Sequence, residues 1–182
     1  MNIGVVRLGT FTSVARAFAC LGRSTELVTP GAAYAGPLVF PGQGKWDSVL
    51  SAVKDGDFIE KNLHGAYPYL GICMGMQMLF EKSDEGPEVG LCRYRGEVKR
   101  LPKGRLPHIG WNLVGARAYY YFCHSYYCEV RAEVKTETAT YEGFEFIASM
   151  RDGPLWACQF HPEKSQLAGA EFLRAWLTEC VK

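Results

Sequence analysis

The apolar and polar positions in the first part of the chain alternate between strand-like and helix-like spacing. Residues 3–6 form a short apolar run typical of a buried strand, and residues 13–21 carry apolar side chains at helical spacing until Gly22 ends the pattern. Residues 26–29 and 37–40 are two further strand candidates. This alternation favours a parallel sheet with helices on both of its faces.

The same pattern returns later in the chain and then changes. Residues 69–72 are a short apolar strand candidate, followed without a linker by residues 73–82, which are good helix formers. From about residue 90 to residue 160, aromatic and β-branched runs between Gly, Pro and charged clusters predict strands with few helices. Residues 167–181 have apolar positions three and four apart and predict a final helix. The sequence therefore predicts an α/β fold.

Length and charge narrow the class of protein. A chain of 182 residues suits one compact domain, so we expect residues 1–182 to form a single unit. The 20 Lys and Arg residues nearly balance the 19 Asp and Glu residues, so no strong field would attract nucleic acid. The chain starts without a secretory signal, and no stretch of about 18 apolar residues could span a bilayer. We therefore expect a cytoplasmic protein that binds neither nucleic acid nor membrane.

The cysteines favour a reducing compartment. Their number, seven, is odd and they show no repeated short spacing, so neither a disulfide framework nor a zinc site is expected. We expect no metal and no cofactor. Most of the cysteines should be small buried residues. Six of them have no surroundings that indicate a reactive thiol and are expected to be structural: Cys20, Cys92, Cys123, Cys128, Cys158 and Cys180.

The remaining cysteine carries the strongest local signal, because it stands between two glycines in the segment Gly71-Ile72-Cys73-Met74-Gly75. At a sharp strand-to-helix turn, small neighbours are required and the central side chain is exposed in the cleft above the sheet. The positive end of the helix favours a thiolate, and the Met74 N–H can point at an oxyanion. A cysteine chosen at random is more often a buried structural residue, but the flanking glycines favour a nucleophile.

A base and its orienting group follow the strand candidate at residues 155–160. His161 would lie at the carboxyl end of that strand, where ligands bind in open α/β sheets. Pro162 stiffens the turn that lets Glu163 fold back toward the imidazole. Cys73, His161 and Glu163 therefore form a candidate nucleophile, base and orienter. The other histidines, His64, His108 and His124, are expected to be structural.

A glycine-bearing turn, Pro41-Gly42-Gln43-Gly44, follows the strand candidate at residues 37–40. Glycines let backbone N–H groups face a ligand, so Gln43 and Gly44 are candidates for the second half of an oxyanion hole beside Met74. Taken alone, Pro-Gly after a strand is most often only a turn.

These motifs together resemble a known family. Residues 71–77 (Gly-Ile-Cys-Met-Gly-Met-Gln) and 159–165 (Gln-Phe-His-Pro-Glu-Lys-Ser) resemble the class I glutamine amidotransferases. Residues 107–112 and 120–126 resemble one branch of that family, the glutaminase subunit of imidazole glycerol phosphate synthase in histidine biosynthesis. The resemblance covers most of the chain from Phe40 onward. It implies a flavodoxin-like three-layer fold with an open, mostly parallel sheet and an additional antiparallel strand region.

The resemblance also implies a reaction and a partner. Such a subunit hydrolyses L-glutamine to glutamate and, in a heterodimer, passes ammonia to a (β/α)8 cyclase subunit, which makes imidazole glycerol phosphate and aminoimidazole carboxamide ribotide. By motif position, the residues that would bind glutamine are Gln77 and Glu85 with the backbone around Ser125 and Tyr126. Those that would face the cyclase and the ammonia path are Lys164, Trp111 and Tyr121. Without the resemblance, these aromatic residues are most often sheet and core residues.

Two departures from the family pattern keep other interpretations open. Residues 7–13 lack the second glycine and the asparagine of the usual loop at the subunit interface, and Gln43 replaces a small apolar residue in the oxyanion turn. One alternative is therefore a paralogous glutaminase subunit that feeds ammonia to a different synthase. Another is a catalytically silent regulatory subunit, against which the intact Cys73, His161 and Glu163 count strongly.

Overall fold

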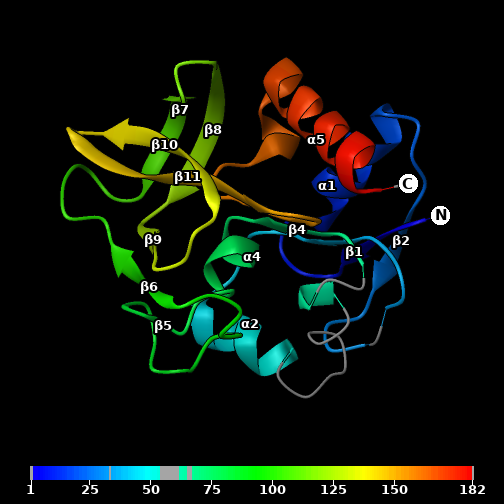
Figure 1. The fold of residues 1–182 in the computed structure, drawn as a ribbon, viewed down its shortest axis with the longest axis horizontal. Helices are drawn as coiled ribbons and strands as arrows, with labels where there is room; N and C mark the ends of the chain where they lie inside the picture. The colour runs from blue at the N-terminus through cyan, green and yellow to red at the C-terminus, as the bar shows by residue number, and fades with distance from the viewer. Residues whose placement is uncertain (1, 33, 54–61, 65–66, 182) are drawn as a thin grey trace.

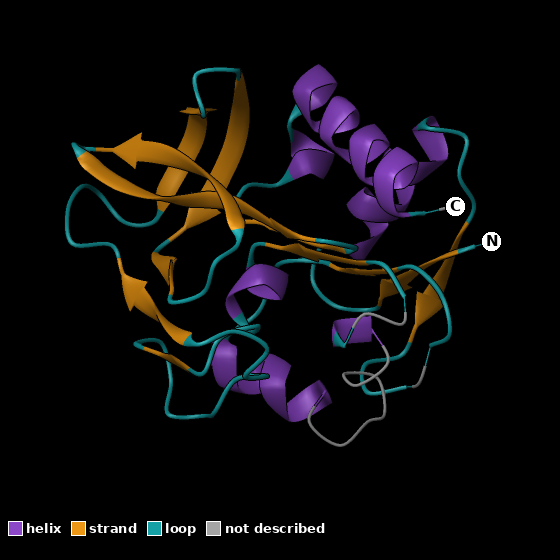
Figure 2. Ribbon diagram, viewed as in Figure 1, coloured by secondary structure: helices purple, strands orange, loops and turns teal. Residues whose placement is uncertain are grey.

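The computed structural model describes residues 2–32, 34–53, 62–64 and 67–181, and its centre is a sheet covered by helices on both faces (Figures 1 and 2). The sheet has nine strands in the order β2-β1-β3-β4-β12-β11-β10-β7-β8. Its parallel half contains β2 (Thr25–Val28), β1 (Ile3–Val6), β3 (Leu38–Phe40), β4 (Tyr69–Ile72) and β12 (Leu155–Cys158). This order is that of flavodoxin-like sheets.

The other half of the sheet is antiparallel. It contains β11 (Phe144–Asp152), β10 (Lys135–Tyr141), β7 (His108–Val114) and β8 (Ala118–His124). A second, three-stranded sheet is formed by β5 (Lys82–Ser83), β6 (Gly96–Arg100) and β9 (Tyr126–Val130). The predicted α/β class, with a parallel sheet and an additional antiparallel region, is confirmed.

The helices form the outer layers. The helices α1 (Phe11–Cys20) and α5 (Gln166–Cys180) cover one face of the sheet, whereas α2 (Trp46–Val53) and α4 (Met74–Gln77) lie on the other (Figure 1). A short 3-10 helix, η1 (Pro162–Lys164), precedes α5. The strands β1, β3, β4 and β12 are buried along their whole length, as expected where helices cover both faces of a parallel sheet.

Each face of the sheet has its own apolar cluster. On the α1 and α5 side, Phe18 and Trp176 meet edge to face with their ring centroids 5.9 Å apart. On the α2 side, Trp46 and Leu50 are fully buried against β3 and β4. These two clusters fix the sheet between its helical layers and so hold the strand ends that carry the site.

One helix prediction was wrong, and one helix was missed. The helix expected over residues 73–82 ends at Gln77, because the Phe80 N–H bonds the Gln77 carbonyl in a tighter turn and the Glu81 N–H then pairs with the Gly96 carbonyl of β6. Pairing with another strand here outweighs local helix propensity. The helix α2 was not predicted, although its buried residues Trp46, Val49, Leu50 and Val53 have helical spacing.

A pair of buried histidines joins β7 to β8. His108 Nδ1 lies 3.1 Å from His124 Nε2, and His124 Nδ1 lies 2.8 Å from the Tyr126 carbonyl oxygen. A carbonyl only accepts, so His124 carries its proton on Nδ1 and accepts at Nε2 from His108. Both rings pack against Phe122. Burial lowers the pKa of His124 to about 3, so the ring is neutral in the folded protein at neutral pH.

The neutral His124 makes the fold sensitive to acid. The unfolded chain binds a proton below the ordinary pKa of 6.5, whereas the folded chain resists protonation until about 3, so stability is lost as the pH falls through this window. Between about pH 7 and about pH 4, we expect the melting temperature of His124→Asn to fall by several degrees less than that of the wild type. The size of this difference follows because 1 kcal/mol shifts the melting temperature by about 2–4 °C. Thermal unfolding followed by circular dichroism measures this difference, with the exposed His64→Asn as the control. Equal acid sensitivity in all three proteins would contradict it.

Candidate active site

Cys73 occupies a strained turn between β4 and α4. Its backbone has φ 51° and ψ −101°, a conformation that residues with a side chain rarely adopt. Hydrogen bonds hold it there, from the Cys73 N–H to the Cys158 carbonyl at 2.7 Å and from the Gln77 N–H to the Cys73 carbonyl at 3.1 Å. A Cβ at Gly71 would lie 2.3 Å from the Gly75 carbonyl oxygen, so the flanking glycine is required by close packing.

The turn of residues 41–44 lies directly against this cysteine. A Cβ at Gly42 would lie 2.2 Å from the Ile72 carbonyl oxygen and 2.4 Å from Cys73 Cβ, so only glycine fits. Gln43, Gly44 and Met74 line the same cleft as Cys73. The first N–H groups of a helix have no partner within it, which leaves the Met74 N–H available to a ligand. The three candidate oxyanion residues are therefore brought together around the sulfur.

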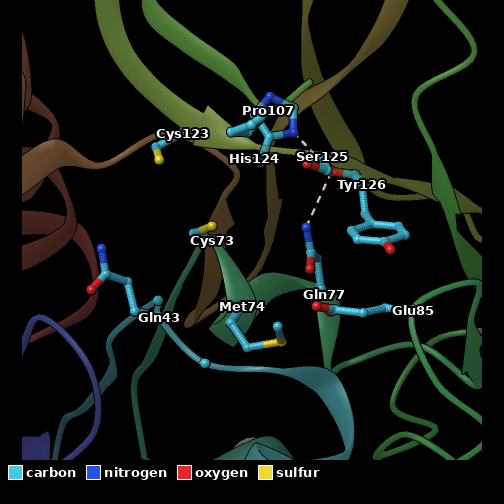
Figure 3. A pocket seen from close by; sticks show the side chains of 12 residues that line it. Gln43, Cys73, Met74, Gln77, Glu85, Pro107, Cys123, His124, Ser125 and Tyr126 are labelled. Atoms are coloured by element: carbon cyan, nitrogen blue, oxygen red, sulfur yellow. Dashed lines mark hydrogen bonds between the residues drawn. The ribbon is translucent and has the colours of Figure 1, made fainter. Parts of the chain in front are cut away.

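The cleft above Cys73 has a volume of about 210 Å³, below the roughly 300–1,000 Å³ of pockets for drug-sized ligands. In Figure 3, Gln43 and Met74 lie on one side of the Cys73 sulfur, with Cys123 and His124 on the other. The residues that line the cleft are Gly42, Gln43, Gly44, Cys73, Met74, Gln77, Glu85, Pro107, Cys123, His124, Ser125 and Tyr126. Its size and polar lining suit a small polar metabolite.

His161 and Glu163 are buried together beside Cys73. His161 Nδ1 lies 2.8 Å from Glu163 Oε1, and both side chains are almost completely inaccessible to solvent. The same carboxylate oxygen accepts a hydrogen bond of 3.3 Å from the hydroxyl of Thr10, the residue before α1. Tyr121 of β8 fixes the backbone of His161, because its carbonyl accepts the His161 N–H at 2.9 Å.

The second imidazole nitrogen, Nε2, is buried and makes no hydrogen bond of standard geometry among the described residues. Burial lowers the pKa of His161, but interactions with Cys73 and Glu163 outweigh this effect and raise the pKa to about 10. These two neighbours therefore favour the protonated form of the imidazole. A protonated imidazole beside a cysteine is the arrangement in which a thiolate is stabilised and a proton can be given to a leaving group.

The residues expected to bind glutamine gather at the other end of the cleft. Gln77, Glu85, Ser125 and Tyr126 all line it (Figure 3). The Gln77 side-chain amide donates to the Tyr126 carbonyl at 3.1 Å. Burial raises the pKa of Glu85, and a hydrogen bond from the Trp46 backbone partly offsets this rise. The cleft thus offers carboxylate and amide groups some way from the sulfur.

The residues expected to face a partner form a separate group. Trp111 of β7 pairs with Tyr121 of β8 in the sheet register, and their rings meet at 73° with centroids 6.2 Å apart. Lys164 of η1 lies with its ammonium 5.8 Å from the Tyr121 ring centroid. These side chains lie beside the His161 loop but do not line the cleft.

Several residues of the site were not found by sequence reasoning. Gln159 donates from its amide to the Cys73 sulfur at 3.4 Å, and Thr10 bonds Glu163. Cys123 and His124, both expected to be structural, line the cleft. For Gln159 a signal existed, because it is a polar residue that ends the apolar run of residues 155–158.

No group of three or more His, Cys, Asp or Glu side chains among the described residues is placed to hold a metal ion. Within the same residues, no helix is both long and apolar enough to cross a membrane.

The chain is similar to known proteins over almost its whole length. A profile of the class I glutamine amidotransferases matches residues 11–180. The imidazole glycerol phosphate synthase subunit HisH of Thermus thermophilus is 40% identical over 179 residues, 91% of this chain and 90% of that protein. The HisH subunit of Moorella thermoacetica is 38% identical over 186 residues, 92% of this chain and 89% of that protein. A solved glutamine amidotransferase shares the fold, with a TM-score of 0.75 at 20% identity over 98% of both chains. The chain therefore belongs to the class I glutamine amidotransferase family and, within it, to the HisH-type subunits of imidazole glycerol phosphate synthase.

Proposed function

We propose that this chain is the glutaminase subunit of an imidazole glycerol phosphate synthase. It hydrolyses L-glutamine to glutamate and delivers ammonia to a cyclase subunit in histidine biosynthesis. The observation that supports this most is the position of Cys73, which lies beside the buried His161–Glu163 pair and lines a cleft together with Gln77 and Glu85. The HisH names of the relatives support the choice of pathway.

The reaction follows from the positions of these groups. The Cys73 thiolate attacks the side-chain amide carbon of glutamine, and the N–H groups of Met74 and of the Gln43–Gly44 turn stabilise the oxyanion. His161 gives its proton to the leaving nitrogen, so ammonia departs and a glutamyl thioester remains. His161 then takes a proton from water, which attacks the thioester and releases glutamate and the thiolate. Glu163 holds the imidazole in orientation throughout.

The far end of the cleft binds the amino-acid head group of glutamine. Glu85 offers a carboxylate to the α-ammonium group, which gains an ion pair in a partly desolvated site. Gln77 and the backbone of Ser125 and Tyr126 complete the polar lining. This arrangement leaves the side-chain amide of the substrate directed at Cys73.

The β7–β8 hairpin offers a surface on which the cyclase can dock, beside the His161 loop. The apolar side chains of one of its faces, Ile109, Trp111, Leu113 and Tyr119, are 38–60% exposed. Three cross-strand pairs bring this face together: Ile109–Cys123, Trp111–Tyr121 and Leu113–Tyr119. Exposed apolar patches of this kind mark protein–protein interfaces, and Lys164 supplies a positive charge at the edge.

The proposal extends to domain organisation and location. Residues 1–182 act as one amidotransferase domain, since a single sheet takes strands from residues 3–158 and α5 packs against the same core. A cytoplasmic location is supported by the seven cysteines, all of them free thiols. A paralogous glutaminase that feeds another synthase stays the alternative, because the loop of residues 7–13 departs from the family pattern. This loop lies close to the oxyanion turn, since a Cβ at Gly9 would lie 2.8 Å from the backbone nitrogen of Gln43.

Cys73→Ala is expected to reduce glutamate release from glutamine to background, because the covalent step needs the sulfur. The measurement is glutamate release with and without a histidine-pathway cyclase and its nucleotide substrate. An unchanged melting temperature controls for folding, and Cys92→Ala, which changes an exposed cysteine, should keep wild-type activity. Retained turnover in Cys73→Ala would exclude this mechanism.

Glu163→Gln removes the negative partner of His161 and is expected to lower kcat on the order of 10²-fold, the scale of acid–base assistance. The variant keeps the shape of the side chain, so KM for glutamine should stay close to that of the wild type. Steady-state kinetics in the presence of the cyclase measure both constants. A raised KM at constant kcat would show instead that Glu163 acts in substrate binding.

Trp111→Ala is expected to weaken binding to the cyclase by about 2 kcal/mol, or about 30-fold in Kd, as for an aromatic residue central to an interface. Titration calorimetry with the cyclase measures the affinity. Leu27→Ala is the control, because Leu27 is an apolar residue that is 54% exposed, against 46% for Trp111, and lies on β2 at the opposite edge of the sheet. Equal losses in the two variants would place the cyclase on another surface.

A further inference from the structure

We propose that Gln159 is a positioning residue that connects the nucleophile Cys73 to the glutamine-binding residue Gln77 through the two ends of one buried amide. The inference rests on the proposed glutaminase function and assigns a role to a residue outside the triad and outside the cleft lining. Gln159 is completely buried, and its backbone N–H is fixed by the Ala148 carbonyl at 2.8 Å.

The side chain of Gln159 makes a hydrogen bond at each polar atom. Its Nε2 donates to the Cys73 sulfur at 3.4 Å, and its Oε1 accepts from Gln77 Nε2 at 3.0 Å. The opposite orientation of the amide would bring two NH₂ groups together at Gln77 and an oxygen lone pair against the sulfur. The surroundings therefore determine which way the amide points.

Gln77 is in turn fixed by two acceptors. One of its N–H bonds goes to Gln159 Oε1 and the other to the Tyr126 carbonyl, which also accepts from His124 Nδ1. With both donors used, the Gln77 carbonyl oxygen is the atom that can meet a ligand in the cleft. Gln77 thus presents an acceptor, which suits the ammonium or NH₂ groups of glutamine.

At the other end of the amide, the N–H donor affects the nucleophile directly. A donor aimed at the sulfur stabilises a thiolate more than a thiol, because hydrogen bonds to charged acceptors are the stronger ones. It also restricts the sulfur to one position beside His161. A carboxyl group at this position could still accept from Gln77 but would offer no N–H to the sulfur, and an apolar side chain would do neither.

Two variants separate these effects. Gln159→Glu keeps the acceptor for Gln77, so we expect kcat to fall about 10- to 100-fold, the loss of a charge-assisted hydrogen bond, with KM within about threefold of the wild type. Gln159→Met keeps the size of the side chain but loses both bonds, so kcat falls similarly and KM for glutamine rises about fivefold or more. Glutamate release by the complex with the cyclase provides both constants.

A second readout does not depend on glutamine. Iodoacetamide alkylates Cys73, and mass spectrometry of the intact chain gives the rate at each pH. We expect the midpoint of the curve of rate against pH to lie at higher pH in both variants than in the wild type. The control is Gln166→Met, the same change at an exposed residue at the start of α5, which should match the wild type in every measurement.

Three results would overturn the proposal: unchanged kcat in both variants, equal KM values in Gln159→Glu and Gln159→Met, or an unchanged alkylation midpoint. Loss of melting temperature alone, with wild-type kinetics, would give Gln159 only a packing role. A wild-type chain that releases no glutamate would overturn the proposed function, while the alkylation midpoints would still decide whether Gln159 acts on Cys73.

Discussion

The site depends on the close approach of three backbone segments around Cys73. The turn at Gly42 touches the Ile72 carbonyl, the strand at Gly71 touches the Gly75 carbonyl, and Gly75 touches the Phe40 carbonyl. A methyl group at any of these glycines would separate the segments. The candidate oxyanion residues Gln43, Gly44 and Met74 belong to the same segments, so the packing that requires glycine also places them in the cleft beside Cys73. The strain at Cys73 persists because the sheet and the buried Tyr69 hydroxyl, bonded to the Gly75 carbonyl, hold both sides of the turn.

Sheet topology brings together residues that are far apart in the sequence. The strands β4 and β12 are parallel neighbours with Ile72 opposite Cys158, so Cys73 and His161 follow the carboxyl ends of adjacent strands. β12 is also the strand where the parallel half of the sheet meets the antiparallel half. Cys73, His161 and Glu163 therefore lie at the boundary of the two halves, with Gln77 and Glu85 on one side and the β7–β8 hairpin on the other.

The sequence predicted most of this arrangement where a physical requirement left a local pattern. The glycines around Cys73 and the Pro-Glu after His161 are such patterns, and the parallel strands appeared as short apolar runs. Other features depend on distant segments. The helix α4 is short because Glu81 pairs with Gly96, and the roles of Thr10 and Cys123 depend on contacts with Glu163 and with the cleft. The missed helix α2 is different, since its helical spacing was readable in the sequence.

The polar groups of the site form two series that meet at Cys73, one charged and one neutral. On one side, Thr10, Glu163 and His161 alternate hydroxyl, carboxylate and imidazolium. A buried carboxylate is costly unless paired, so the raised pKa of His161 is the counterpart of burying Glu163. On the other side, Gln159, Gln77 and His124 are neutral and are linked by hydrogen bonds through amide and carbonyl groups. In the proposed mechanism, the charged series serves proton transfer and the neutral series orients the substrate-binding residues. Both series contact Cys73, so this one sulfur atom must satisfy both requirements.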